Sequence, residues 1–374
     1  MTVLAAALAS LAAVPLAAHL ASAGAAVAAT RRAPPEGEAR FRPFISLLRP
    51  VHGLDPHDRE TLKSGLTQDY PAYEVIFCAA SADDPACAAV REMIAAHPEV
   101  PARLLIGDGG LSSNPKLNNL AKGVAAARSD WLVMADANLL LAPEYLAGLA
   151  DSWQADTGLV SGPPLGTRAE GFWSAVECAF LNTNQARWQL ATGALGFGFA
   201  QGKTLFWNRK VLEAGGGLAA LGRDMAEDVA STKLVRAQGL RVQLPARLSA
   251  QPVGRRSARA VWDRQLRWSR VRRDGFPGLF LAEIAQGSVL GLASLAALVA
   301  LGAVPGWLPA LFLALWYGTE AGFARALGLV LTPRDLAAML VRDALLPVLW
   351  FATFARRGFD WRGTAMGGAR APAE

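Results

Sequence analysis

The first thirty residues constrain the fold most, because a long segment without charge belongs in a lipid bilayer. Residues Thr2–Thr30 contain no Asp, Glu, Lys or Arg. As a helix rising about 1.5 Å per residue, this segment exceeds the ~30 Å hydrocarbon core of a membrane. We therefore predict a retained transmembrane helix over residues 1–30. The competing interpretation is a cleaved signal peptide, which the small residues Ala21-Ser22-Ala23 favour and the lack of Lys or Arg at the start disfavours.

The next two residues indicate on which side of the membrane the following domain lies. Arg31 and Arg32 come directly after the apolar segment. Short segments rich in Lys and Arg beside a transmembrane helix stay preferentially in the cytoplasm. We therefore expect the domain that follows to face the cytoplasm.

A second apolar region, followed by a short tail, occupies residues 276–374. It contributes to a composition of 52% hydrophobic and 18% charged residues, which is too apolar for a soluble protein of this size. The long apolar runs of this region are Leu279–Val304, Leu308–Leu331 and Leu336–Phe354. The first two are each long enough to span a bilayer, so Glu283, Glu320 and Arg325 within them must face protein or the interface.

The last of these runs is interrupted by Arg342 and Asp343. It either crosses the membrane with these two side chains paired or lies in the interface. We therefore expect two or three membrane helices in the C-terminal region.

Residues 31–275 show a different pattern, in which short apolar runs alternate with helical stretches. The predicted strands are Phe44–Leu48, Tyr73–Cys78, Arg103–Ile106, Trp131–Ala135, Gly158–Ser161, Lys203–Trp207 and Arg241–Pro245. The predicted helices between the early strands are His57–Thr67, Pro85–Ala96, Lys116–Ala126 and Pro143–Trp153. Such alternation indicates an α/β domain with a mostly parallel sheet and helices on both faces. Ligands bind outside the carboxyl ends of the strands, which draws attention to the loops after Cys78 and Ala135.

A strongly basic stretch ends this domain, directly before the apolar region. Eight arginines and one acid, Asp263, lie between Arg255 and Arg273. A polybasic segment in this position is typical of contact with anionic lipid headgroups. No nucleic-acid recognition motif accompanies the charge, so we predict an anionic membrane surface as a partner and no nucleic acid.

Asp136 is the first candidate binding residue, because it directly follows the apolar strand Trp131–Ala135. A carboxylate there suits a divalent cation that bridges a diphosphate, since Mg²⁺ typically takes one or two carboxylates plus phosphate oxygens. The alternative is an Asp that caps the next turn. Asp83 and Asp84 follow another strand and precede Pro85, so they either contact a nucleotide or start a helix.

Two further polar groups lie at predicted helix starts. The segment Asn114-Pro115-Lys116, followed by Asn118, combines a helix N-terminus with a lysine, which suits an anionic diphosphate; a plain N-cap with a solvated lysine is the alternative. Glu227 and Asp228 open another helix, where acids interact favourably with the helix dipole. One of these two carboxylates could instead act as a base towards an incoming hydroxyl.

The basic stretch contains the last candidate element. Arg264 lies on one helix face with Arg267 and Trp268 because of their i, i+3 and i, i+4 spacing. Arginine suits phosphate, and tryptophan suits the edge of a sugar or lipid. The alternative is an ordinary basic amphipathic helix that lies on a membrane.

In this order, these elements resemble the ceramide glucosyltransferase family, an inverting branch of the nucleotide-diphospho-sugar transferases with a GT-A-type fold. The resemblance extends from about Ile45 to Arg273. Its motifs are Ser46-Leu47-Leu48-Arg49-Pro50, Asp69-Tyr70-Pro71, Asp83-Asp84-Pro85-Ala86, Asn114-Pro115-Lys116, Asn118-Asn119-Leu120, Asp136, Glu227-Asp228 and Arg264-x-x-Arg267-Trp268. Three spaced acids followed by an Arg/Gln-x-x-Arg-Trp element are specific in combination.

The resemblance implies a role for the matching residues. Asp83 and Asp84 would contact the uridine of a UDP-sugar donor, and Asp136 would hold the divalent cation, Mg²⁺ or Mn²⁺, on its diphosphate. Asp228 would be the base that deprotonates the hydroxyl of a membrane lipid acceptor. The other substrate-binding residues would be Lys116, Asn118, Glu227, Arg264, Arg267 and Trp268.

The sequence departs from the family in two places. Asp136-Ala137-Asn138 lacks one acid of an acid-x-acid element, which leaves fewer ligands for a metal. Thr183-Asn184-Gln185-Ala186-Arg187 replaces a stretch that contains a histidine in animal members, so we expect different acceptor contacts. Bacterial relatives also glycosylate diacylglycerol and hopanoids, and these acceptors remain alternatives to ceramide.

The resemblance, together with the apolar segments, therefore implies an integral membrane enzyme of a bacterial inner membrane that adds one hexose, glucose, to a lipid hydroxyl. A processive polysaccharide synthase shares the fold and a similar closing motif, but usually has more membrane helices. A membrane-anchored nucleotide-binding protein without catalysis is the alternative from another class, because fold does not ensure activity.

Overall fold

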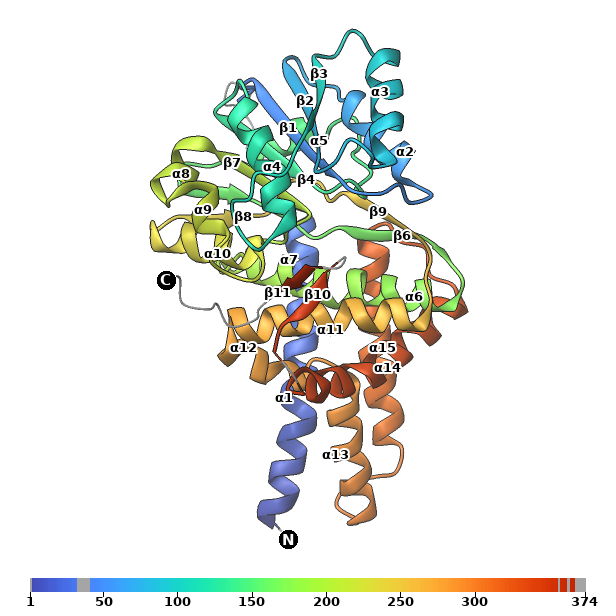
Figure 1. The fold of residues 1–374 in the computed structure, drawn as a ribbon. Coiled ribbons are helices and arrows are strands. Elements are labelled where there is room, and N and C mark those ends of the chain that lie inside the picture. Colours follow the sequence, from blue (N-terminus) through green and yellow to red (C-terminus); the bar gives the residue numbers. More distant parts are fainter. Residues whose placement is uncertain (1, 32–40, 356, 362–363, 367–374) are drawn as a thin grey trace.

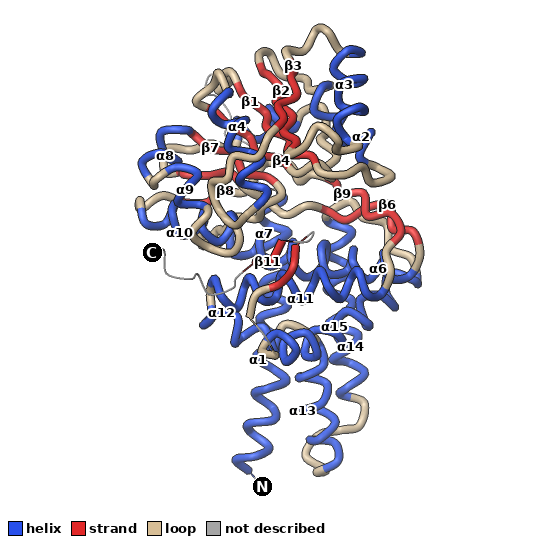
Figure 2. The backbone as a smooth tube through the Cα atoms, viewed as in Figure 1, coloured by secondary structure: helices blue, strands red, loops and turns tan. Residues whose placement is uncertain are grey.

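The computed structural model describes residues 2–31, 41–355, 357–361 and 364–366. Arg32, one of the two arginines used above for orientation, lies outside the described residues. Figure 1 shows a broad part built around a β-sheet and a narrow part of helices that ends at the N-terminus. Figure 2 shows that the strands are confined to the broad part and its border with the helices.

A seven-stranded sheet forms the centre of the broad part, with the order β3-β2-β1-β4-β7-β5-β8. Its strands are β1 (Ile45–Val51), β2 (Tyr73–Ala79), β3 (Ala102–Ile106), β4 (Trp131–Ala135), β5 (Thr157–Val160), β7 (Thr204–Asn208) and β8 (Arg241–Gln243). Strand β7 is antiparallel to β4 and β5, and the other pairs are parallel. The predicted strands and the mostly parallel sheet are confirmed.

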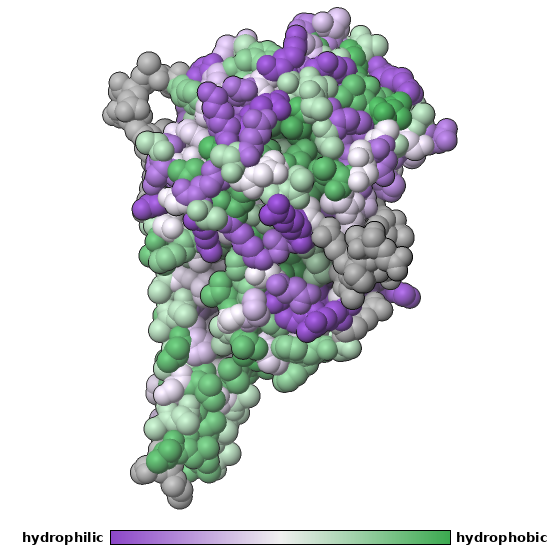
Figure 3. All heavy atoms as spheres, turned by 60° about the vertical axis from the view of Figure 1, so that its left-hand side comes forward, coloured by the Kyte–Doolittle hydropathy of each residue, from purple (hydrophilic) through white to green (hydrophobic). Residues whose placement is uncertain are grey.

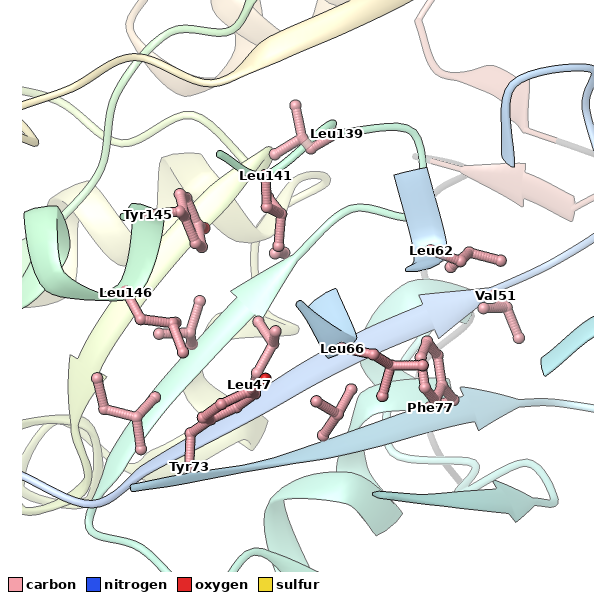
Figure 4. Packing of buried hydrophobic residues seen from close by; sticks show 14 of the residues in the cluster. Leu47, Val51, Leu62, Leu66, Tyr73, Phe77, Leu139, Leu141, Tyr145 and Leu146 are labelled. Carbon is pink, nitrogen blue, oxygen red and sulfur yellow. The ribbon is translucent and has the colours of Figure 1, made fainter. Parts of the chain in front are cut away.

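Helices cover both faces of this sheet, because successive side chains of a strand point to opposite faces. Leu47 packs on one face with α2 (Asp58–Lys63), α3 (Ala86–Ala96) and α5 (Tyr145–Asp151). Leu48 packs on the other face, which is covered by α4 (Pro115–Ala126), α8 (Arg209–Ala214), α9 (Gly217–Leu221) and α10 (Glu227–Ala237). Figure 4 shows the first face, where Leu47 and Phe77 of the strands lie among Leu66, Tyr145 and Leu146.

A smaller sheet, which we did not predict, lies below the main one. It pairs β6 (Leu165–Glu170) in parallel with β9 (Ala250–Arg255). Neither segment has the apolar alternation of a half-buried strand, and their pairing joins distant parts of the chain, so local sequence carries little signal for it. The remaining strands, β10 (Phe359–Trp361) and β11 (Thr364–Met366), form an antiparallel pair.

Both strands of the small sheet lead into helices at the border of the broad part. Strand β6 is followed by α6 (Phe172–Ala179), the π-helix η2 (Phe180–Gln185) and α7 (Ala186–Ala194). Strand β9 is followed by α11 (Ala258–Gly275), which Figure 1 shows lying across the border. Ser257 caps α11, because its side chain accepts a hydrogen bond from the backbone N–H of Ala260.

The narrow part combines the two ends of the chain. Helix α1 (Thr2–Thr30) packs against α13 (Ser288–Ala300) and α14 (Leu308–Ala326), and all three run in the same general direction in Figure 1. Helix α15 (Pro333–Thr353) packs mainly on α6 and α11 and runs across that direction. Figure 3 shows hydrophobic residues covering the tip of the narrow part and hydrophilic residues covering much of the broad part.

Two helices of the described residues are long and apolar enough to cross a membrane, Val3–Thr30 and Pro333–Thr353. The predicted continuous run Leu279–Val304 is instead bent by 48° between Pro277–Ala285 and Ser288–Ala300, and the pair qualifies only if it counts as one span. Gly287 occupies the break between the two parts. Helix α14, from the second predicted run, is not among the helices that are long and apolar enough to cross a membrane.

Three charged side chains of the C-terminal region, Glu320, Arg342 and Asp343, face protein, as expected for Glu320. Arg342 Nη2 lies 2.6 Å from Glu320 Oε1, and Arg342 Nε lies 2.8 Å from Asp343 Oδ1. All three side chains are at most 2% exposed. The pairing that we considered for Arg342 and Asp343 is therefore present. Glu283 pairs with Arg272 of α11, whereas Arg325 is exposed.

Candidate active site

Strands β1, β2 and β4 are parallel neighbours, so their carboxyl ends meet at one edge of the sheet. They end at Val51, Ala79 and Ala135. The predicted acids Asp83, Asp84 and Asp136 follow two of these ends. Their positions place all three on the edge where an α/β sheet binds its ligands.

Asp136 lies between two lysines at this edge. Its Oδ1 is 2.6 Å from Lys116 Nζ, and its Oδ2 is 2.9 Å from Lys203 Nζ. Lys203 Nζ also donates to Asn138 Oδ1 at 3.1 Å. Burial opposes ionisation of Asp136, but the charges of Lys116 and Lys203 outweigh it and hold the pKa of this carboxyl well below its usual range. Asp136 is therefore a carboxylate at neutral pH.

Lys116 joins Asp136 to the first residue of α10. Its Nζ lies 2.7 Å from Glu227 Oε1, while Asn114 Nδ2 donates to Glu227 Oε2 at 3.0 Å. Burial disfavours the ammonium, yet the charges of Asp136 and Glu227 raise the pKa of Lys116 above its usual value. Asn114 is also the N-cap of α4, because its side chain accepts from the backbone N–H groups of Lys116 and Leu117.

Gly202 allows this close packing. A Cβ on this residue would lie only 2.6 Å from Glu227 Oε1. The Gly202 carbonyl accepts a hydrogen bond from Lys116, and its N–H donates to Asp228 Oδ2 at 3.1 Å. We expect any side chain at position 202 to displace the carboxylates of α10.

Asp228 differs from the other carboxylates because no lysine pairs with it at salt-bridge distance in the described part of the chain. It accepts hydrogen bonds from the backbone N–H groups of Gly202 and Val229. Burial and the adjacent charge of Glu227 raise the pKa of Asp228 to about 6. A carboxylate with such a pKa accepts a proton more readily than an ordinary Asp and is still mostly ionised at neutral pH.

The acids after β2 have structural contacts of their own. Asp84 accepts hydrogen bonds from the backbone N–H groups of Gly53, at 3.0 Å, and Ala86, at 2.9 Å. It thereby joins the loop after β1 to the start of α3, and His52 Nδ1 lies 3.5 Å away. Asp83 is exposed at the same edge. Neither acid contacts the Lys116–Asp136 group.

Asn118 lies one turn into α4 and holds the preceding loop. Its Oδ1 accepts from Ser112 N–H at 2.8 Å, and its Nδ2 donates to the Ser112 carbonyl at 3.0 Å. The neighbouring Asn119 donates to the carbonyls of Val51 and Cys78 at two strand ends. These contacts explain why asparagines occur inside a helix, where their intrinsic propensity is poor.

Arg264 of α11 is held by a buried acid that sequence reasoning missed. Its Nη1 lies 2.8 Å from Glu177 Oε1 of α6, and Glu177 is 1% exposed. Arg264 also lies over the Trp268 ring, 5.9 Å from its centroid. Arg267 and Trp268 are both half-buried on the same helix. Glu177 is 87 residues from Arg264 in sequence, so no local pattern could have paired them.

The charge of Arg264 also acts on Lys203 of the cluster at the sheet edge. Burial lowers the pKa of Lys203, and the positive charge of Arg264 lowers it further. Direct contacts therefore bring Lys116, Asp136, Glu227 and Asp228 together, and Arg264 is held separately by Glu177. Lys203 was not among the predicted site residues. It is the first residue of a predicted strand, and its contact with Asp136 could not be predicted because the two residues lie far apart in the sequence.

The donor set for a divalent cation is small. No group of three or more His, Cys, Asp or Glu side chains that could hold a metal occurs in the described residues. Asp136 Oδ2 and Asn138 Oδ1 nevertheless converge on one cation, the Lys203 ammonium. One carboxylate and one amide oxygen fit Mg²⁺ or Mn²⁺ when phosphate oxygens and water complete the shell.

Comparison with known proteins gives one family along the chain and a similar fold in a solved structure. Residues 3–370 match glycosyl transferase family 21. Ceramide glucosyltransferase 1 of Caenorhabditis elegans is 27% identical over 249 residues, which are 66% of this chain and 53% of that protein. Ceramide glucosyltransferase of Komagataella phaffii is 37% identical over 112 residues, 29% of this chain and 22% of that protein. The chain thus spans about half the length, or less, of the curated relatives it matches.

The structure is similar to that of a mannosyltransferase from Pyrobaculum calidifontis, solved in complex with GDP-Man and Mn²⁺. The TM-score is 0.57 at 19% identity, and the match covers 91% of this chain and 99% of the other. At such low identity the similarity shows a shared fold and nothing more, and this fold agrees with the predicted GT-A-type architecture.

Proposed function

The chain belongs to glycosyl transferase family 21, and from this premise we propose that it transfers one hexose, glucose, from a UDP-sugar to the hydroxyl of a membrane lipid such as ceramide. The observation that carries the proposal is Asp228, a carboxylate with a pKa of about 6 beside the Lys116–Asp136–Glu227 group. This arrangement combines a proton acceptor with cations for a departing diphosphate.

The donor diphosphate would bind among Lys116, Lys203 and Arg264. These side chains carry positive charge at the carboxyl edge of the sheet, where cations stabilise negative charge that develops on a leaving group. A divalent cation held by Asp136 and Asn138 would add to this neutralisation when bound. Asp83 and Asp84 follow the neighbouring strand and would contact the uridine.

Asp228 would act as the base. In one displacement the lipid hydroxyl oxygen forms a bond to the anomeric carbon, the bond from that carbon to the diphosphate breaks, and Asp228 takes the hydroxyl proton. The products are a glycolipid and UDP, and attack opposite the leaving group inverts the anomeric configuration. Glu227 would support this step by keeping the pKa of Asp228 high while Lys116 and Asn114 hold Glu227 in place.

The membrane helices would bring this chemistry to the bilayer. The proposed organisation is a membrane helix in residues 1–30, a glycosyltransferase domain in residues 31–275 and a membrane region in residues 276–374. Arg31 after α1 and the arginines of α11 support a domain on the cytoplasmic face, in contact with anionic headgroups. Arg267 and Trp268 would lie near the acceptor on the same helix.

The test uses the purified full chain in lipid nanodiscs with UDP-glucose, Mn²⁺ or Mg²⁺, and ceramide. We expect UDP release together with a glycolipid that carries one β-linked hexose, identified by mass spectrometry and by the anomeric proton coupling in NMR. Diacylglycerol and a hopanoid serve as parallel acceptors. A ladder of longer products would instead identify a processive synthase, and donor binding without turnover would contradict catalysis.

A further inference from the structure

The backbone of the main sheet fixes the position of Lys203 beside Asp136. The N–H of Asp136 donates to the Lys203 carbonyl at 3.0 Å. The adjacent residues, Ala135 and Thr204, are partners in the antiparallel pair of β4 and β7. Residues opposite each other on antiparallel strands have Cβ atoms roughly 4.5–5.5 Å apart. The Lys203 side chain therefore begins next to Asp136 because of the strand register, and not because of any bound molecule.

The Lys203 ammonium lies between the two oxygens that fit a divalent cation. Its Nζ is 2.9 Å from Asp136 Oδ2 and 3.1 Å from Asn138 Oδ1. A metal ion on these two oxygens needs the place that the ammonium takes, and two cations in contact repel each other. Lys203 and a metal ion therefore exclude one another at this pair of oxygens.

The loop that carries the two oxygens is held by the protein on both sides of Asn138. The Ala137 carbonyl accepts hydrogen bonds from Arg49 Nη2 at 3.1 Å and from Thr61 Oγ1 at 2.6 Å. Arg49 Nη2 also donates to the Leu139 carbonyl at 3.1 Å, and Arg49 is fully buried. Because the loop is fixed and a lysine side chain is flexible, the lysine is the partner that moves when a metal ion binds.

The two lysines on Asp136 are not held equally. Lys116 Nζ contacts two carboxylates, those of Asp136 at 2.6 Å and Glu227 at 2.7 Å, and the Gly202 carbonyl at 2.5 Å. Within the described chain, Lys203 contacts one carboxylate and one amide oxygen. Its side chain also lines a cavity beside β7, which gives it room to leave. Lys203 is therefore the lysine that is easier to displace.

Displacement of Lys203 changes the charge of the site. The ion pairs are balanced as they stand, because Lys116 and Lys203 face the carboxylates of Asp136 and Glu227. A divalent cation on Asp136 would add positive charge and leave the Lys203 ammonium without its carboxylate. A diphosphate compensates both changes, since its oxygens accept from an ammonium and complete the shell of the cation. The exchange is therefore favoured when cation and diphosphate bind together.

We propose that Lys203 competes with the divalent cation for Asp136 and Asn138. It holds these two oxygens until a diphosphate binds, and it then exchanges them for oxygens of the diphosphate while the cation takes its place. Lys203 thereby makes binding of the cation depend on the donor. The inference rests on the proposed function for the diphosphate, whereas the competition itself needs no turnover.

The experiment measures Mn²⁺ binding to the full chain in phosphatidylcholine nanodiscs without nucleotide, from the electron paramagnetic resonance signal of free Mn²⁺. Phosphatidylcholine is used because anionic lipids attract cations themselves. Lys203→Met removes the competing ammonium and should tighten Mn²⁺ binding at least about fivefold, the lower end of typical couplings between ligands. Equal Mn²⁺ affinity of a folded Lys203→Met chain and the wild type would overturn the proposal.

Two further variants separate the charge of Lys203 from its size and from the overall charge of the protein. Lys203→Arg keeps a cation at the same place and should bind Mn²⁺ as weakly as the wild type. Lys210→Met removes an exposed lysine of α8 and should also bind Mn²⁺ as the wild type does. Tightening by Lys210→Met equal to that by Lys203→Met would reduce the effect to general charge and contradict the proposal.

UDP serves as the diphosphate in a second titration of the same preparations. It should increase the Mn²⁺ affinity of the wild type more than that of Lys203→Met, because the variant has no ammonium to displace. An equal or larger increase in the variant would contradict the exchange.

A measurement on the wild type does not depend on a substitution being tolerated. Acetic anhydride labels lysine amines, and mass spectrometry compares Lys203 with Lys116. Saturating Mn²⁺ without nucleotide should raise the labelling of Lys203, which loses its ion pair, and leave Lys116 unchanged. Addition of UDP should lower the labelling of Lys203 again. Labelling of Lys203 that does not respond to saturating Mn²⁺ would overturn the proposal.

The outcomes separate this inference from the proposed function. If UDP-glucose is never turned over but Lys203→Met binds Mn²⁺ more tightly, the proposed function fails and the competition stands. If turnover occurs and Lys203→Met binds Mn²⁺ as the wild type does, the proposed function stands and the competition fails.

Discussion

The molecule contains two groups of buried charges, and they differ in how completely those charges are satisfied. Where η2, α14 and α15 meet, Arg342 contacts both oxygens of Glu320, at 2.6 and 2.7 Å, as well as Asp343 and Thr183. At the sheet edge, Lys116 and Lys203 satisfy Asp136, but Asp228 has only backbone N–H donors among its contacts in the described chain. In the first group every charged side chain has a charged partner, whereas the second group includes a carboxylate, that of Asp228, which can still take a proton.

This difference separates a structural role from a chemical one. A buried ion pair whose members all have partners holds segments in place, and removing one member leaves an uncompensated charge. A carboxylate with a raised pKa at a ligand-binding edge is typical of a site that does chemistry. Substitutions in the two groups should therefore have opposite effects on stability and activity.

The largest effect on activity is expected from Asp228→Asn. Removing a general base typically costs 10²–10⁴-fold, so we expect kcat to fall by at least about a hundredfold. Because the raised pKa means that the ionised form is disfavoured in the fold, Tm should stay the same or rise. UDP release and thermal unfolding of the same preparation measure both quantities. Full activity of the variant would contradict the proposal that Asp228 is the base.

Arg342→Met should act in the opposite way, on stability first. It leaves Glu320 and Asp343 without their common partner, and breaking a buried pair typically costs roughly 3–5 kcal/mol. We expect a lower Tm and a smaller yield of folded chain in detergent. The triple variant Arg342→Met, Glu320→Leu, Asp343→Asn is the control, because it removes all three charges together and should recover much of the loss. A variant that is stable but inactive would place Arg342 in the chemistry instead.

The dependence on pH should follow Asp228. Since its pKa is raised to about 6, the base is ionised above this pH and protonated below it. We expect kcat/KM to fall about tenfold per pH unit as the pH drops below about 6. Glu227→Gln removes a charge that raises the pKa of Asp228, so the fall in kcat/KM should begin at a lower pH. If the fall begins at the same pH in Glu227→Gln, the charge of Glu227 does not raise the pKa of Asp228.

Arg168→Ala should have the smallest effect. Arg168 forms an exposed ion pair with Glu60, with 43% and 48% of the two side chains accessible. Exposed pairs contribute about 0–1 kcal/mol, and the contribution decreases with salt. Activity should remain that of the wild type, and Tm should shift by no more than a few degrees in low salt. A larger loss would show that the small β6–β9 sheet depends on this contact.

The sequence was informative where a local pattern has a local cause. Strands such as Trp131–Ala135 were predicted because apolar runs bounded by polar turns have few other stable conformations, and Asp136 was singled out because it ends such a strand. The same reasoning placed Lys116 at a helix start. That these residues meet follows from the order of the strands in the sheet, which a pattern of single segments does not contain.

Contacts between distant segments were not predictable in this way. Glu177 lies inside an apolar helix and looks like an isolated charge until α11 brings Arg264 to it. Lys203 was taken only as the first residue of a strand. The pair β6 and β9 is held by hydrogen bonds between segments about 85 residues apart, for example Leu165 and Ala250, and its composition resembles a loop.

The π-helix η2 makes the length of this segment important as well as its composition. A π-helical turn closes on i→i+5 hydrogen bonds and an α-helical turn on i→i+4, so deleting one residue from Phe180–Gln185 would allow the segment to return to a regular α-helix. The helices on either side would keep their places, including Arg187, whose guanidinium contacts Ser22 of α1, while the side chains inside the segment would move to regular helical positions. Such a deletion would therefore change what this segment presents to its neighbours and spare the attachment of the N-terminal helix.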